Sequence, residues 1–504
     1  MKKIFLLILL MQLALCMHAQ NKFLTDSLDN YIAREMQRWN IPGVAVSVVH
    51  KGKIIFMKGF GVRDINSSQK VDENTLFQIA SNTKAYTGTA LAMLEEQKRL
   101  SLNDKITKYF PDFKLFDELA TREVTIRDML CHRIGFRTFQ SDLLNWDCNL
   151  SRKELIQNMR NVEPVYSFRS RYGYCNACFL TAGEIIPVVT DTSWDDFLKY
   201  NFFIPLGMKR TSTDQATILN DKNSAKPYTI FDGRLTALHY ADINALAPAA
   251  SINSCVKDIS NWILMQLDSG RFGGKEIIPF AAIQKTRSSS MVVRDQQNPE
   301  FKSKHFYTYG LGWFLEDYEG RKIISHDGGA NGFVTNTTLI PEENFGFTIL
   351  TNTDANNFYG ALQQQLTDAI LNVPYKNRSA ESFQEFQVYN SRQDSIVRDL
   401  LQKSTGKKPA LALDEYAGKF SNPVYGTIEI KNVSGRLMIY FSHHPKLNGR
   451  LMSLGENNFL CAYSDVTYGV KETPFEVKDG KVVSITIKVN DFVDYMPYVF
   501  AKSE

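Results

Sequence analysis

The chain has 504 residues, of which 44% are hydrophobic and 22% charged, and this globular composition excludes wholesale disorder. At roughly 150 residues per domain, the length predicts two or three folded units. The 58 basic and 54 acidic residues give a net charge of +4 without a clustered basic stripe, which excludes a nucleic-acid partner.

The first segment has the pattern of a secretory signal peptide. Lys2 and Lys3 precede an apolar run over residues 4–15 that is too short for a membrane span. Cleavage after Ala19 makes residues 1–19 the signal and predicts an exported, periplasmic protein. A lipoprotein attached through Cys16 is the less favoured alternative, because the preceding Leu15 is bulky. No later run of 18 apolar residues predicts a transmembrane segment.

The elements expected next in the chain alternate between strand and helix patterns. Residues 24–39 predict an amphipathic helix, residues 44–49 and 54–56 a hairpin, and residues 83–280 a mostly helical region. Further strands are expected at 309–314, 322–325, 336–340 and 346–350, followed by a helix that places Leu362, Leu366 and Ile370 on one face. Strands at both ends of a helical region predict an α+β fold. The strands of its antiparallel sheet come from both ends of this part of the chain.

The C-terminal part has a different character. Residues 379–411 predict a linker with one amphipathic helix, and residues 412–504 predict an all-β sandwich or small barrel. The expected strands are 416–420, 426–430, 436–441, 459–462, 475–477 and 482–489.

Six cysteines follow the predicted signal, among them Cys175 and Cys178 with redox or metal spacing. No second such pair or nearby histidine completes a zinc site, so we interpret the two as small buried residues on one helix. Thiol chemistry is the remote alternative, and a disulfide between Cys131 and Cys148 stays open. No metal or other cofactor is predicted.

The tetrad Ser81-Asn82-Thr83-Lys84 stands directly before a helical pattern. Positions i and i+3 of a helix share one face, so the Ser81 hydroxyl and the Lys84 amine can meet. The helix N-terminus also directs free backbone N–H groups at an oxyanion. The alternative is an N-cap serine beside a solvated lysine, and the tetrad alone does not decide.

Tyr174 and Asn176 open a second helical pattern. Because the ordinary tyrosine pKa is near 10, a phenolate at pH 7 costs about 4 kcal/mol, which a nearby ammonium such as Lys84 would offset. Asn176 would orient Lys84 or a substrate carbonyl. A half-buried structural tyrosine is the alternative.

The third candidate segment is His326-Asp327-Gly328-Gly329, on the strand pattern that begins at Lys322. Two glycines after the strand would let a substrate backbone lie against the sheet edge, and the Gly329 N–H would be an oxyanion donor. A lone histidine is more often structural, so this segment indicates a catalytic site only in combination with the other two segments.

Together and in this order, the three segments resemble the motifs of the serine β-lactamase and penicillin-binding protein superfamily. They are most similar to its class C-related branch, which includes D-aminopeptidases and esterases. The resemblance covers about residues 22–375, within a predicted hydrolase domain of residues 20–378. It implies a β-lactamase/transpeptidase-like antiparallel sheet flanked by helices, with a helical subdomain. Residues 412–504 resemble the lipocalin-like β-barrel domain appended to exported members. Further matches are Asp128–His132 with Gly135, Pro205–Met208 and Tyr309–Trp313.

The resemblance also implies roles for the candidate residues. Ser81 would be the acyl nucleophile, and Lys84 with Tyr174 would handle the proton. Substrate binding and oxyanion stabilisation would fall to Asn176, His326, Gly328 and Gly329. The expected partner is a small-molecule or peptide substrate, with D-amino-acid-containing and peptidoglycan-derived peptides among the candidates; the oligomeric state is not predicted.

The sequence departs from the superfamily at His326, which replaces the lysine of the lactamases' K-T-G motif. A histidine with an ordinary pKa is largely neutral at pH 7, which favours peptide, amide or ester substrates over β-lactams. Asp327 is expected to raise that pKa and restore part of the cation. Pro248–Ser251 replaces a frequent glycine pair. The alternatives are β-lactamase or DD-peptidase activity, and a non-catalytic cell-wall or β-lactam sensor.

Overall fold

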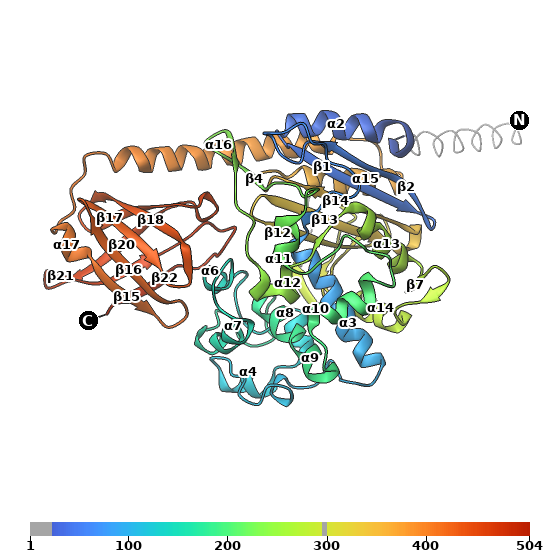
Figure 1. Cartoon of the computed structure of the whole chain (residues 1–504), viewed down its shortest axis with the longest axis horizontal. Helices are drawn as coiled ribbons and strands as arrows, with labels where there is room; N and C mark the ends of the chain where they lie inside the picture. Colours follow the sequence, from blue (N-terminus) through green and yellow to red (C-terminus); the bar gives the residue numbers. More distant parts are fainter. Residues whose placement is uncertain (1–22, 295–299, 504) are drawn as a thin grey trace, which may run out of the picture.

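The computed structural model describes residues 23–294 and 300–503. The predicted signal peptide, residues 1–19 with Cys16, lies outside the described residues. Figure 1 shows a sheet-and-helix unit and a β-barrel beside it, with the long helix α16 (Arg378–Lys403) running along the top of the view from one to the other. α16 therefore occupies most of the predicted linker. Among the described helices, none has the length and apolar character needed to cross a membrane.

The larger unit is built on an eight-stranded antiparallel sheet of order β2-β1-β14-β13-β12-β11-β10-β9. The N-terminal hairpin pairs with the last strand, with Val46 opposite Ile349, so both ends of this unit meet in one sheet. This confirms the predicted α+β fold. The strands are β1 (Gly43–His50), β2 (Lys53–Gly61), β9 (Met291–Arg294), β10 (Tyr307–Tyr309), β11 (Phe314–Tyr318), β12 (Arg321–Ala330), β13 (Phe333–Ile340) and β14 (Phe345–Thr351).

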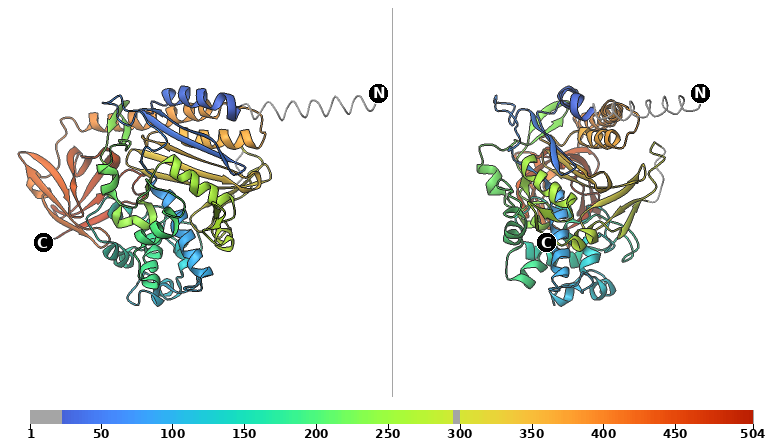
Figure 2. Two further views of the ribbon diagram at one scale, coloured as in Figure 1. Left: turned by 45° about the vertical axis from the view of Figure 1, so that its right-hand side comes forward. Right: turned by 90° about the vertical axis from the view of Figure 1, so that its right-hand side faces the viewer.

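Helices cover both faces of this sheet (Figure 2). One face packs against α2 (Leu28–Arg38), α15 (Phe358–Ile370) and the start of α16, which share one hydrophobic core with alternate residues of β1 such as Val46. The neighbouring Ala45 belongs to the core on the other face, as the period of two in a strand requires. Burial on both faces explains why β1 is mostly apolar along its length, with Ser47 as a buried exception, rather than alternating.

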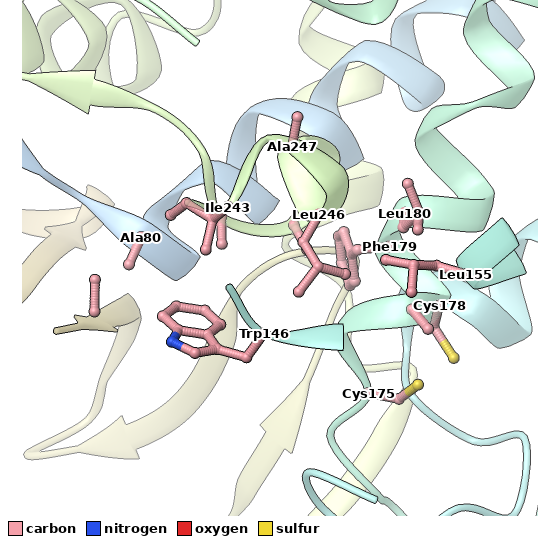
Figure 3. Close-up of a cluster of buried hydrophobic side chains, with 14 of the residues drawn as sticks. Ala80, Trp146, Leu155, Cys175, Cys178, Phe179, Leu180, Ile243, Leu246 and Ala247 are labelled. Atoms are coloured by element: carbon pink, nitrogen blue, oxygen red, sulfur yellow. The ribbon is translucent and has the colours of Figure 1, made fainter. Parts of the chain in front are cut away.

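The helical part of the chain packs against the second face through a large apolar core. Figure 3 shows one part of this core, where Trp146, Phe179 and Leu246 lie close together. The helices are α3 (Thr83–Glu96), α4 (Glu118–Glu123), α5 (Ile126–Leu130), α6 (Asp142–Asn145), α7 (Arg152–Asn158), α8 (Asn176–Gly183), α9 (Ile185–Thr190), α10 (Trp194–Leu198), α11 (Gln215–Asn220), α12 (Ala247–Ala250), α13 (Val256–Leu267) and α14 (Phe280–Thr286). Three two-stranded sheets lie in the same part of the chain. They pair β3 (Phe77–Gln78) with β6 (Asn253–Ser254), β4 (Tyr228–Phe231) with β5 (Arg234–Ala237), and β7 (Arg271–Phe272) with β8 (Lys275–Glu276).

The cysteines of the described residues are free thiols, so the disulfide considered between Cys131 and Cys148 is not formed. Cys175 is the N-cap of α8 and Cys178 lies in its first turn. Both are buried, which confirms their interpretation as small core residues at one helix.

The C-terminal unit is a closed eight-stranded barrel, because β15 pairs with β22. Sequence patterns missed β18 and β22. In β18, Pro445, Asn448 and Gly449 are turn residues that interrupt the alternation of apolar and polar side chains. A short helix α17 (Leu413–Tyr416) precedes the barrel. Its strands are β15 (Gly418–Asn422), β16 (Gly426–Val433), β17 (Arg436–Phe441), β18 (His444–Gly455), β19 (Asn458–Tyr463), β20 (Val470–Lys478), β21 (Lys481–Ile487) and β22 (Tyr498–Lys502).

Two sequence predictions about strands are wrong. The strand expected at 309–314 breaks, because Gly312 has a φ of +97° and a Cβ there would lie 2.3 Å from the Lys84 carbonyl oxygen. The chain therefore turns against α3 between β10 and β11. Gly328 and Gly329, expected after a strand, lie inside β12.

Candidate active site

Ser81 and Lys84 stand where the sheet meets the helical part. Ser81 lies in the 3₁₀ turn η2 (Ala80–Asn82), which leads directly into α3. The preceding Ala80 has a φ of +45°, a conformation that non-glycine residues rarely adopt. Nζ of Lys84 lies 3.1 Å from Oγ of Ser81, as the helical spacing of the two residues predicts.

The Lys84 amine is buried and has three oxygen neighbours. Besides Ser81 Oγ, it donates to Asn176 Oδ1 at 2.7 Å and to the Ala249 carbonyl at 3.0 Å. Burial lowers the pKa of Lys84 to about 7, because a low-dielectric environment disfavours the charged form. A neutral amine has two N–H bonds and one lone pair. Asn176 and Ala249 accept the two protons, so the lone pair is free to receive the Ser81 proton.

Asp142 of α6 fixes the other end of the Asn176 amide, whose Nδ2 donates to Asp142 Oδ2 at 2.7 Å. Burial raises the pKa of Asp142 to about 6, against the effect of hydrogen bonds from Asn145 and Asn176 and the charge of Lys84. Its carboxylate in turn favours the charged form of Lys84. Sequence reasoning missed Asp142 and the Ala249 carbonyl. The only sequence signal near the Ala249 carbonyl was that residues 248–251 replace a frequent glycine pair. In the structure these residues belong to helix α12 or follow it directly.

Tyr174 covers the lysine, with the centre of its ring 4.6 Å from Lys84 Nζ. Burial raises the pKa of Tyr174 above its ordinary value, although a hydrogen bond with Ser81 partly opposes that rise. Tyr174 is therefore a phenol in the free protein, and the offset expected from the Lys84 ammonium does not ionise it. Burial moves both groups toward their neutral forms, so near pH 7 Lys84 is charged only in part and offsets only part of the cost of a phenolate.

His326 is a buried, neutral side chain in the lining of the cleft. Its Nδ1 lies 2.6 Å from the Asp327 carbonyl oxygen and its Nε2 lies 3.0 Å from the Tyr309 hydroxyl. A carbonyl only accepts, so Nδ1 carries the proton and Nε2 accepts from Tyr309. Burial and then the charge of Lys84 lower the pKa of His326 to about 3. The expectation that Asp327 restores a cation is wrong, because Asp327 accepts a hydrogen bond from Asn336 and contributes only its backbone carbonyl to His326.

The strand β12 brings its glycines next to Ser81. β11 begins at Phe314, which pairs with Ser325, so β11 leaves one edge of β12 uncovered from His326 onward. A Cβ on Gly328 would lie 2.1 Å from the Ile79 carbonyl oxygen. Only glycine allows the strand to pass this close to the turn that carries Ser81. Gly328 and Gly329 therefore line the same cleft as Ser81, Tyr174, Asn176 and His326.

The cleft has a volume of about 520 Å³ and both units line it. The barrel contributes Phe492, Val493 and Tyr495 from the loop between β21 and β22. The Phe492 ring would lie 3.3 Å from a Cβ on Gly329, and the Tyr495 ring stacks on Phe139 with a centroid distance of 5.6 Å. This loop forms a wall of the cleft.

Hydrogen bonds fix this loop to the segment that carries Asp142. Asp494 accepts from the backbone N–H of Leu143 at 3.0 Å and from the Tyr498 hydroxyl at 2.7 Å, and the same hydroxyl accepts from the N–H of Ser141. The bonds from Ser141 and Leu143 to this loop join residues about 350 positions apart in the chain, so no local sequence pattern could reveal them. The described residues contain no cluster of three His, Cys, Asp or Glu side chains that could hold a metal ion.

Comparison with protein families identifies the larger unit. The family model described as Beta-lactamase matches residues 28–371, which is most of the chain. The chain belongs to the β-lactamase family. A second model, described as a domain of unknown function (DUF3471), matches residues 402–502, the region of the barrel.

Curated relatives and solved structures agree with this family. Protein flp of Staphylococcus aureus strain MW2 is 26% identical over 352 residues, which are 69% of this chain and 66% of flp; the chain thus spans just under two thirds of that relative. Unguisins hydrolase ungD of Aspergillus violaceofuscus is 26% identical over 435 residues, 81% of this chain and 76% of ungD.

Among solved structures, the octameric penicillin-binding protein homologue from Pyrococcus abyssi superimposes with a TM-score of 0.62 at 20% identity, over 94% of this chain and 99% of its own. The crystal structure of SurE gives a TM-score of 0.58 at 15% identity, over 96% and 100%. At these identities the likeness shows a shared fold. Because the coverage is nearly complete, that shared fold includes the barrel as well as the sheet.

Proposed function

We propose that the protein is an exported serine hydrolase that cleaves peptide, amide or ester bonds through an acyl-enzyme on Ser81. One observation carries this proposal: the buried Lys84 amine, with its pKa lowered to about 7, has two acceptors for its protons and the Ser81 hydroxyl as its third neighbour. This arrangement activates a nucleophile that is weak alone.

Acylation follows from the contacts. Ser81 Oγ attacks the substrate carbonyl as its proton passes to Lys84 Nζ, and the N–H groups of Ser81 and Gly329 stabilise the oxyanion. Tyr174, which stays a phenol in the free protein, donates its proton to the leaving group and recovers one from the Lys84 ammonium. Water then attacks the acyl carbonyl, Lys84 and Tyr174 relay its proton to Ser81 Oγ, and the acid is released.

The substrate class follows from charge. A β-lactam carries a carboxylate beside its reactive ring, and the neutral His326 supplies no fixed cation for it. Peptides, including those with D-amino acids or derived from peptidoglycan, and esters fit better. The name of the relative ungD supports hydrolysis. Export to the periplasm rests on the signal pattern of residues 1–19, and the domain limits 20–378, 379–411 and 412–504 are part of this proposal.

Labelling with a fluorophosphonate probe tests the nucleophile. We expect stoichiometric labelling of wild type, loss of labelling in Ser81→Ala, and retention in Ser288→Ala, a substitution at an exposed serine outside the cleft. Turnover of p-nitrophenyl esters and D-amino-acid anilides should disappear with the label. A wild-type protein that neither labels nor turns over these substrates would refute the proposal, and one that binds penicillin without turnover would indicate a sensor.

A further inference from the structure

The described part of the chain supplies no cationic side chain to the lining of the cleft along β12. The described residues that line it include no lysine or arginine, and His326 is neutral with both ring nitrogens bonded inside the protein. Arg294 and Arg137 lie over the rings of Tyr307 and Tyr495, at 5.3 Å and 5.8 Å from the ring centres, and belong to the surroundings of the cleft. A substrate anion in this part of the cleft would therefore lack a counter-charge from its lining.

An anionic side chain stands there instead. Asp327 lines the cleft and is exposed to it. Its Oδ1 accepts a hydrogen bond from Asn336 Nδ2 at 2.7 Å, which fixes the carboxyl group and leaves Oδ2 available to a ligand. The surrounding walls of the cleft and the charge of Glu316 raise the pKa of Asp327 above its ordinary value, but the rise is limited because the side chain is exposed. At pH 7.5 the group is still mainly ionised.

Aromatic rings flank this carboxylate. Phe314 pairs with Ser325, two residues before Asp327, and its ring stacks on Tyr307 with a centroid distance of 5.2 Å. Tyr359 of α15 lines the same cleft, and the charge of Asp327 is the largest cause of its raised pKa. Aromatic faces beside a carboxylate attract organic cations, because the negative face of each ring adds to the attraction of the ion pair.

We propose that Asp327 makes the protein selective for substrates that carry an ammonium or guanidinium group beside the reacting carbonyl, and that it excludes substrates with a carboxylate there. This inference rests on the proposed function, since it concerns which acyl substrates reach Ser81. Peptides with a free amino group or a basic side chain fit the site. An anionic substrate would place like charges together in a partly dehydrated cleft, which is unfavourable.

Two series of substrates that differ only in charge test this selectivity. On the acyl side, alanine p-nitroanilide is compared with its N-acetyl and N-succinyl forms, in both D and L configurations. On the leaving-group side, acetylcholine is compared with 3,3-dimethylbutyl acetate, its neutral carbon isostere. In at least one series we expect kcat/KM of the cation to exceed that of the neutral compound about tenfold, or about 1.4 kcal/mol. The succinyl compound should be the slowest in its series.

Asp327→Asn removes the charge while its side-chain oxygen can still accept from Asn336. We expect the ratio of kcat/KM between cation and neutral isostere to fall to about one in this variant, while Asp479→Asn, in an exposed barrel turn, keeps the wild-type ratio. Labelling of Ser81 by the fluorophosphonate shows that each variant is folded and able to react. Equal rates within both series, a fastest succinyl compound, or a preserved ratio in Asp327→Asn would overturn the inference. Absence of labelling in wild type would refute the proposed function instead.

Discussion

The two sides of the cleft differ in the forces that build them. On the β-lactamase side, Ser81, Lys84, Asn176 and Asp142 form a buried chain of hydrogen bonds. On the barrel side, the cleft wall is a loop whose Phe492 ring faces Gly329 through apolar contact. Loss of one partner from a buried polar chain costs about 1–3 kcal/mol, whereas loss of an aromatic wall mainly changes the space. We therefore expect the first side to set the rate and the second side to select the substrate.

Lys84→Met gives the largest expected effect. Met fills similar space without a base, so the rate of Ser81 acylation should fall by about 10²–10⁴-fold, the usual contribution of a positioned general base. In wild type the rate should rise as the pH increases through about 7, because the neutral amine is the active form and burial lowers the Lys84 pKa to that value. The variant should lose this rise. The measurement is the second-order rate of labelling between pH 5.5 and 8.5.

Lys285→Met is the matched control, because Lys285 pairs with Glu95 and Glu96 at a partly exposed site outside the cleft. It should keep the wild-type pH profile. A Lys84→Met protein that folds, judged by circular dichroism, and acylates within tenfold of wild type would show that another group takes the Ser81 proton. The assignment of catalysis to the polar side would then be wrong.

The parts of this site that were predictable are local in the sequence. Ser81 and Lys84 share one helical face, and their spacing alone predicts that they meet. The protonation states were not predictable, because the pKa values of Tyr174 and His326 depend on burial that only the folded chain creates. Spacing therefore predicts the contact between Ser81 and Lys84, while the protonation states of Tyr174 and His326 follow from the fold.

Contacts between residues far apart in the chain were not predictable from the sequence, for a different reason. The antiparallel sheet follows from strands at both ends of a helical region, since apolar strand patterns persist wherever they pair. Asp142, in contrast, carries no motif, and its importance comes from contact with Asn176, 34 residues away. The barrel loop is further still from its partners, about 350 residues along the chain. No local sequence pattern indicates such contacts.

Phe492→Ala tests the barrel side, with an effect smaller than that of Lys84→Met. Removing the ring next to Gly329 enlarges the cleft, which should favour bulky substrates. We expect kcat/KM for a bulky acyl ester, relative to kcat/KM for an acetyl ester, to rise about tenfold. Most of this change should come from faster turnover of the bulky ester. The measurement is a series of p-nitrophenyl esters of increasing acyl size. The polar chain at Ser81 is untouched by this change, so the pH profile of labelling should keep its midpoint.

Tyr440→Ala, at an exposed aromatic residue of β17 in the barrel, provides the control and should leave the size ratio unchanged. If Phe492→Ala lowers the rates of all esters equally, the loop supports the chemistry rather than substrate selection. The contrast between the two sides of the cleft would then disappear.

Asp494→Asn gives the smallest expected effect and tests how the two sides are joined. Asp494 is buried where the barrel loop meets the segment that carries Asp142. Burial raises its pKa to about 7, although hydrogen bonds from Leu143, Met496 and Tyr498 act to lower it. The folded state therefore holds this proton more tightly than the unfolded state, where an aspartate has a pKa near 3.9. The contribution of Asp494 to the free energy of unfolding is largest at low pH and is lost as the pH rises from about 4 to about 7.

An asparagine cannot ionise, yet its side-chain oxygen still accepts from the Leu143 N–H. We therefore expect Asp494→Asn to melt close to wild type at pH 5 and a few degrees higher at pH 8, roughly 1 kcal/mol in stability. Thermal unfolding followed by circular dichroism across this range measures the difference, with Asp479→Asn as an exposed control. A difference that does not change with pH would mean that Asp494 is not dehydrated. In that case water reaches the Asp494 carboxyl in the folded protein, and its hydrogen bond from the segment that carries Asp142 is not shielded from solvent.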